Sequence, residues 1–354
     1  MRNPFQLTDL HELPWWRDVP RYDDKNQIFE TLTQDLENAF QTAVHSGAFR
    51  RFAQEYTKVA TAMFEQMPTE PLLATILERS YRRLITFYCY LRQRRRSERT
   101  HLQGDTSIVK WQIEPDLLVE ALKQADEMQQ AGVSSQEFSL QSSPKLLRWI
   151  RANYWPLVSK FGGTAAVPIT YAHIRCIDAD KKKDGYRDRF RHHCFGNHHF
   201  DHDVYSLPLL IYLSDVSIND GPFEYLSASD RYSHNFVLRA FHQSINHDCQ
   251  LTSLEDTCFA SFAKLPSVFR GGDAFGNFYP QSEFEKAGPV VVEGGAGTTI
   301  LFDGFNTVHA GGLPRAGIRK SLFVNFRFPV AKILPEIRSL LSPPRPTFAS
   351  RLGA

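Results

Sequence analysis

The chain has 354 residues, 42% hydrophobic and 23% charged, values typical of a globular protein with one large or two ordinary domains. A net charge of +2 argues against a general nucleic-acid-binding protein. Five scattered cysteines without a Cys-x-x-Cys pair argue against a disulfide framework or a cysteine zinc site, and fit a reducing cytoplasm. The start shows no secretory signal and no apolar run reaches the ~18 residues that span a bilayer, so we expect a cytoplasmic protein without a membrane partner.

The first 165 residues are predicted to be mainly helical. Apolar residues recur at helical spacing in three successive segments, at 28–43, 49–63 and 73–91. A fourth helix is predicted over 116–130 and stops at Gly132. A fifth begins at Ser143-Pro144 and ends near Gly162. We expect these helices to form an N-terminal region, residues 1–165, that packs on the rest of the chain.

The pattern changes near Val167, where short β-branched or aromatic runs begin to alternate with Gly, Asp, Asn and Pro. Many short strands separated by turn signals predict an antiparallel sandwich or barrel, and hence an α+β fold with a β domain at 166–330. A long irregular insert is expected at about 231–288, and a Pro-rich C-terminal tail at 331–354. The candidate strands are 169–177, 198–202, 207–213, 223–226, 290–292, 298–302 and 321–328.

The most informative motif is His199-Phe-Asp201, followed far along the chain by His309 and then by Arg319. Residues two apart on a strand point to the same face, so His199 and Asp201 can reach one ion. His309 follows the strand at 298–302 and is the natural third ligand. Two imidazoles and one carboxylate form the facial triad that binds non-haem Fe(II) and leaves coordination positions open. Arg319 is placed to anchor an acidic co-substrate by a charge-assisted contact.

The sequence offers two alternatives to this set. His202-Asp203 is a second candidate ligand pair, but adjacent residues face opposite sides of a strand, so the pair that lies two apart is preferred. Arg327, later on the last predicted strand, is the alternative to Arg319 as the anchor. His192 and His193 are interpreted as solvated polar residues, and His198 is expected to face away from His199.

Two segments resemble a known family. Residues 199–226, HFDHDVYSLPLLIYLSDVSINDGPFEYL, resemble the central segment of the phytanoyl-CoA dioxygenase family, in which a His-x-Asp strand precedes a Tyr-Leu strand and a Gly-Pro-Phe-Glu-Tyr turn. Residues 297–319, GTTILFDGFNTVHAGGLPRAGIR, look like the block that carries that family's distal histidine and co-substrate arginine. The resemblance covers roughly residues 167–330 and is specific in these two blocks.

The resemblance implies a double-stranded β-helix, a cupin-like jelly roll, that uses Fe(II), O2 and 2-oxoglutarate as co-substrate. His199, Asp201 and His309 would be the catalytic iron ligands, and Arg319 would bind the distal carboxylate of 2-oxoglutarate. The family often has a polar residue, commonly lysine, early on the Tyr-Leu strand, where this chain is apolar. Candidate partners for the other carboxylate are, by placement, Arg175, Asn197 and Tyr212.

We therefore expect a 2-oxoglutarate-dependent non-haem iron oxygenase that hydroxylates an unactivated C–H bond of a small molecule. By family analogy, the substrate is an amino acid or a secondary-metabolite intermediate. Related halogenases have a small residue where this chain has Asp201, so hydroxylation is favoured. The alternatives are a protein or peptide hydroxylase on the same fold and a non-catalytic jelly-roll binding module. Substrate choice is expected to lie in the 178–197 loop, the 231–288 insert and part of the helical region.

Overall fold

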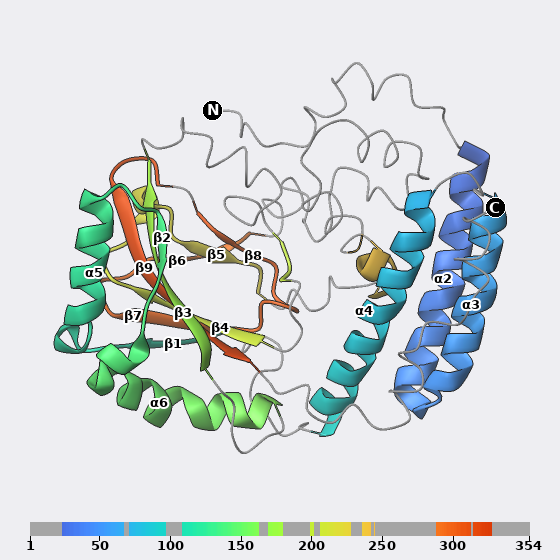
Figure 1. The fold of residues 1–354 in the computed structure, drawn as a ribbon, viewed down its shortest axis with the longest axis horizontal. Helices are drawn as coiled ribbons and strands as arrows, with labels where there is room; N and C mark the ends of the chain where they lie inside the picture. The colour runs from blue at the N-terminus through green and yellow to red at the C-terminus, as the bar shows by residue number, and fades with distance from the viewer. Residues whose placement is uncertain are drawn as a thin grey trace. The chain divides into compact units, whose positions relative to one another are not determined.

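The computed structural model describes residues 23–66, 71–96, 108–162, 169–179, 199–201, 206–227, 236–241, 244, 288–312 and 314–327. These residues form helices and antiparallel sheets that belong to two compact units (Figure 1). The helical unit draws on Met1–Arg92, Ser233–Pro280 and Ala331–Ala354, and the sheet unit on Gln93–Tyr232 and Gln281–Val330. The domain boundaries predicted at 165 and 330 stay predictions. The tail and most of the insert lie outside the described residues.

The helical unit contains α2 (Asp23–Ser46), α3 (Phe49–Gln66), α4 (Pro71–Arg96) and a single helical turn at 236–241. The three long helices confirm the apolar stripes predicted at 28–43, 49–63 and 73–91. Their apolar faces meet in an aromatic core: the rings of Phe40 and Phe52 lie 5.1 Å apart, and those of Phe49 and Tyr88 lie 4.5 Å apart. None of the described helices of the chain is long and apolar enough to cross a membrane.

The sheet unit combines two helices with two antiparallel sheets. The helices are α5 (Val119–Gln130), which ends at the left-handed Gly132 (φ 70°), and α6 (Pro144–Gly162), and both confirm predicted helices. The strands are β1 (Ile108–Gln112), β2 (Ser135–Glu137), β3 (Ile169–Asp178), β4 (Ser206–Tyr212), β5 (Phe223–Tyr225), β6 (Val290–Val292), β7 (Thr298–Phe302), β8 (His309–Gly311) and β9 (Ile318–Arg327).

The larger sheet has the strand order β1-β7-β4-β9-β3-β2, and the smaller one has the order β6-β5-β8 (Figure 1). The two sheets share an apolar core, because Tyr212 and Phe302 of the larger sheet pack with Phe223 and Val292 of the smaller one. The opposite face of the larger sheet carries helices. Cys176 of β3 donates through its thiol to a carbonyl of α5, and α6 packs on β1 and β7. β4 is buried on both of its faces, which explains why its sequence is a continuous apolar run.

Most predicted strands are confirmed within one to three residues, including β3, β4, β5, β6, β7 and β9. The strands β1, β2 and β8 were not predicted. β1 and β2 lie in the region expected to be mainly helical and pair with β7 and β3 across long sequence separations. The strand predicted at 198–202 is present as an isolated bridge at His199, and its two end residues lie outside the described part of the chain.

Candidate metal centre

Two backbone anchors bring the three predicted ligands together. His199 forms an isolated antiparallel bridge with His309, the first residue of β8, through two N–H to carbonyl bonds of 2.9 and 3.0 Å. The amide of Asp201 donates to the carbonyl of Gly304 at 2.7 Å. An extended segment between these contacts puts the side chains of His199 and Asp201 on one side, as their spacing predicts.

The ligand atoms of His199, Asp201 and His309 all lie within 4.8 Å of one another. Nε2 of each histidine is 3.7 Å from Oδ1 of Asp201. Bonds from a divalent ion to imidazole or carboxylate are roughly 2.0–2.2 Å, so adjacent ligand atoms would be about 3 Å apart and opposite ones about 4 Å. The two histidine–aspartate distances fall between these limits, and the ligand atoms of the two imidazoles lie within 4.8 Å of each other. Both imidazoles are buried and the Asp201 side chain is 28% exposed, so the cluster is open on the carboxylate side.

A backbone carbonyl orients the ring of His309. Its Nδ1 lies 2.8 Å from the carbonyl oxygen of Thr307, and since a carbonyl only accepts, Nδ1 carries the proton. Nε2, on the side of Asp201, is therefore the unprotonated nitrogen, the one that can bind a metal ion. The rings of Phe302 and Phe223 lie 4.7 and 5.6 Å from the imidazole and restrict its rotation.

Arg319 lies on β9 opposite Ile177, and it is only 4% exposed. Among the described residues, no hydrogen-bond partner reaches its buried Nε and Nη1. Burial lowers its pKa to about 10, Tyr212 opposes that shift and Arg175 adds to it, so the group is still a cation at neutral pH. A buried guanidinium without an anion is unfavourable, and the site therefore favours an acidic ligand.

Gly311 links this cation to the metal ligands. A Cβ at Gly311 would lie 3.3 Å from Nη2 of Arg319, so the guanidinium packs directly against the glycine backbone. Gly311 and His309 are two apart on β8 and face the same side, about 7 Å from each other. The Arg319 guanidinium therefore lies against the strand that carries His309, on the face to which His309 points.

The other candidates are placed less favourably. Tyr212 is fully buried, but its hydroxyl donates its single proton to the Val292 carbonyl at 2.8 Å. The guanidinium of Arg175 lies 4.6 Å from the ring centroid of Phe323, on the same face of the sheet as Arg319. Arg327, the alternative anchor, is exposed at the end of β9. Asn197 and the alternative pair at 202–203 lie outside the described residues.

The sequence-based prediction overlooked the turn at 303–307, between β7 and β8. All five of its residues are buried. A Cβ at Gly304 would overlap Oδ2 of Asp201, so the carboxylate occupies the space that the missing side chain leaves. The signal available in the sequence was Asp303-Gly-Phe-Asn306, a turn-like composition directly before a histidine.

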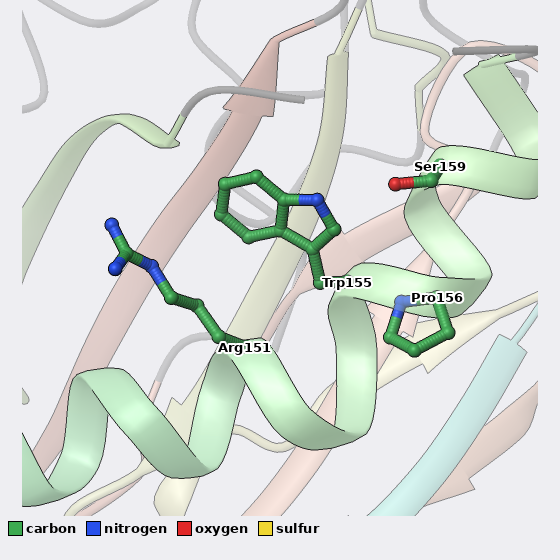
Figure 2. Close-up of a pocket in the computed structure, with 4 residues that line it drawn as sticks. All are labelled: Arg151, Trp155, Pro156 and Ser159. Atoms are coloured by element: carbon green, nitrogen blue, oxygen red, sulfur yellow. The ribbon is translucent and has the colours of Figure 1, made fainter. Parts of the chain in front are cut away.

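A separate hollow lies on α6, lined by Arg151, Trp155, Pro156 and Ser159. Figure 2 shows the Trp155 ring between the side chains of Arg151 and Ser159, and the Arg151 guanidinium lies 5.4 Å from the ring centroid. Because α6 covers the face of the larger sheet opposite the shared core, this hollow does not belong to the ligand cluster.

No family model and no curated protein matches the chain. It is similar in structure to EctD from S. alaskensis with 2-oxoglutarate and 5-hydroxyectoine, at 14% identity and a TM-score of 0.37, over 66% of this chain and 75% of that one. It is also similar to the epimerase SnoN in complex with Fe3+, alpha ketoglutarate and nogalamycin RO (16%, TM-score 0.37, 68% and 83%). A third is AviO1 from Streptomyces viridochromogenes Tue57 (14%, TM-score 0.35, 69% and 98%). At TM-scores this low, no activity is carried over from these proteins.

Proposed function

We propose that the chain is a 2-oxoglutarate-dependent non-haem iron oxygenase with His199, Asp201 and His309 as the iron ligands. The observation that carries this proposal is a two-histidine, one-carboxylate cluster beside a buried arginine whose Nε and Nη1 have no hydrogen-bond partner among the described residues. The cluster suits Fe(II) and leaves open positions. The arginine suits the distal carboxylate of a co-substrate that reaches the metal with its other end.

Each residue has a defined task in this proposal. Fe(II) and 2-oxoglutarate supply the oxidative chemistry, in which O2 is used to oxidise the co-substrate to succinate and CO2 and to hydroxylate a C–H bond. His309 presents Nε2 because Thr307 holds its Nδ1 proton. Arg319 orients the co-substrate, and the phenylalanine rings around His309 exclude water.

The decisive experiment is anaerobic addition of Fe(II) and 2-oxoglutarate to the purified protein. We expect a weak visible charge-transfer band from the chelate, and loss of that band in Asp201→Ala. The matched control is Asp126→Ala, which removes a carboxylate that pairs with Lys320 of β9 at 2.6 Å, away from the ligand cluster. That variant should keep the band. A wild-type protein that neither binds Fe(II) nor develops the band would rule out the oxygenase and favour a binding module.

The finer parts of the proposal are a double-stranded β-helix core, membership of the phytanoyl-CoA dioxygenase-like family and a small-molecule substrate to be hydroxylated. The two motif blocks at 199–226 and 297–319 support the family. The two antiparallel sheets that share one core support the fold. Screening small molecules for substrate-coupled succinate release tests the substrate class, and release coupled only to peptides would contradict it.

A further inference from the structure

The turn between β7 and β8 contacts two of the three metal ligands without supplying a ligand itself. The carbonyl of Gly304 accepts the Asp201 amide at 2.7 Å, and the carbonyl of Thr307 accepts the Nδ1 proton of His309 at 2.8 Å. The relative position of the carboxylate and the imidazole is therefore set by the distance between two carbonyls of one turn.

A buried side-chain pair holds that turn in shape. Nδ2 of Asn306 donates to Oδ2 of Asp303 at 2.7 Å, and the Asn306 amide donates to Oδ1 at 3.3 Å. The amide of Thr307 donates to the Asp303 carbonyl at 2.8 Å. Asp303 is 1% exposed and Asn306 is 3% exposed, so little water competes for these bonds. The carboxylate of Asp303 thus binds Asn306 and its carbonyl binds Thr307, so that both residues are held to the first residue of the turn.

Gly304 packs directly against the Asp201 carboxylate, so the position of this carboxylate depends on the position of the turn. The Asp201 carboxylate fills the place of a side chain at Gly304, so a small shift of the turn moves the carboxylate relative to both imidazoles. Protein interiors are close-packed and transmit such shifts rather than absorbing them.

We propose that Asp303 and Asn306 are positioning residues of the metal centre: their hydrogen-bonded pair holds the turn that orients Asp201 and His309, and so determines metal affinity without contact with the metal. This inference rests on the proposed function, because it presumes that the cluster binds a metal ion. Groups that orient metal ligands from behind typically change metal affinity by about 10–100-fold when they are removed.

The test is a titration with Co(II), followed by its visible absorption and by calorimetry, on wild type, Asn306→Ala and a matched control. The control is Tyr154→Phe, which removes a buried side-chain hydrogen bond to Thr299 in the same unit, on the opposite face of the larger sheet. We expect Asn306→Ala to bind Co(II) about 10–100-fold more weakly and to change the absorption spectrum. Tyr154→Phe should stay within about twofold of wild type, since the hydrogen bond that it removes lies on the opposite face of the sheet from the ligand cluster.

If Asn306→Ala does not fold, Gly304→Ala takes its place, because it adds one methyl group that displaces the Asp201 carboxylate. A folded turn variant that binds Co(II) with wild-type affinity and has a thermal midpoint lowered as in Tyr154→Phe would show that the turn is only structural. That result would overturn this inference but leave the proposed function standing. Absence of Co(II) binding by the wild-type protein would overturn the proposed function as well. A His309→Ala variant that binds Co(II) like wild type would also overturn it, because the ion would then bind elsewhere.

Discussion

At the scale of single residues, Arg319 carries an unfavourable energy in the absence of a ligand. Its guanidinium is buried, charged at neutral pH and without a hydrogen-bond partner at Nε and Nη1 within the described structure. We predict that Arg319→Met leaves the thermal midpoint of the ligand-free protein unchanged or higher, because a flexible apolar side chain replaces an unpaired cation.

The same substitution should abolish stabilisation by 2-oxoglutarate. A ligand at about 100 times its Kd stabilises the folded state by ~2.7 kcal/mol, which corresponds to a midpoint shift of roughly 5–10 °C. Thermal melts with Co(II), with and without 2-oxoglutarate, measure this shift. Arg327→Met, on the exposed end of the same strand, is the control and should keep it. A destabilised Arg319→Met variant that still responds to 2-oxoglutarate would show that the arginine is structural.

The site residues that the sequence identified are those that belong to short motifs of neighbouring residues. His199 and Asp201 follow from strand alternation, and the distal His309 and Arg319 follow from the second motif block. Their proximity agrees with that interpretation, while their roles stay predictions. The sequence did not indicate the roles of Gly304 and Gly311. These glycines matter because they have no side chain where another segment of the chain packs against them, and only the folded structure shows that contact.

At the scale of elements, the packing of α6 on the larger sheet depends on Tyr154. Its ring is fully buried, lies 4.6 Å from Trp111 of β1, and its hydroxyl bonds to Thr299 of β7. Thr299 also accepts from the Trp111 amide at 3.1 Å and donates to the Trp111 carbonyl at 2.9 Å. The hydroxyl of Tyr154 therefore contributes less than the ring does.

We predict that Tyr154→Phe lowers the free energy of unfolding by about 1 kcal/mol, because Thr299 keeps its backbone partners. Tyr154→Ala should lower it by about 3–5 kcal/mol through the cavity that it leaves. Denaturant unfolding of both variants measures the two values. Equal losses for the two substitutions would mean that the hydrogen bond, and not the ring, holds α6 against the sheet.

The elements that the sequence predicted correctly are those with a clear pattern of apolar residues along their own length. The long helices have apolar stripes over many turns, β4 has a continuous apolar run, and β9 is mainly apolar from Leu322 to Phe326. β2 has the sequence Ser-Gln-Glu with all three residues exposed, and β8 has only three residues. Such strands are formed by pairing with a neighbour that is distant in the sequence, so no local pattern indicates them.

At the scale of the whole molecule, the chain contributes to the helical unit more than once. The turn at 236–241 belongs to the insert expected at 231–288, yet it packs with α2. Glu37 of α2 accepts the Val237 amide at 2.9 Å through Oε2, and the Gln41 side chain at 2.6 Å through Oε1. A carboxylate on one helix thus satisfies the free N–H groups at the start of another. No linear pattern predicts a contact across 200 residues.

Glu37 gives the unit a specific pH dependence. Burial raises its pKa above the usual 4.5, and the hydrogen bonds from Gln41 and from the amides of Val237 and Phe236 only partly oppose this. The folded state therefore holds the proton more tightly than the unfolded chain. That stabilisation is complete below pH 4.5 and is lost as the pH rises through the folded-state pKa. We predict that Glu37→Gln, which keeps an acceptor for Val237, matches wild type at pH 4 and has a higher thermal midpoint than wild type at pH 8. The control is Glu55→Gln, which removes an exposed carboxylate of α3 that pairs with Lys58. A Glu37→Gln midpoint below wild type at pH 8 would mean that the ionised carboxylate is a net stabiliser of the helical unit.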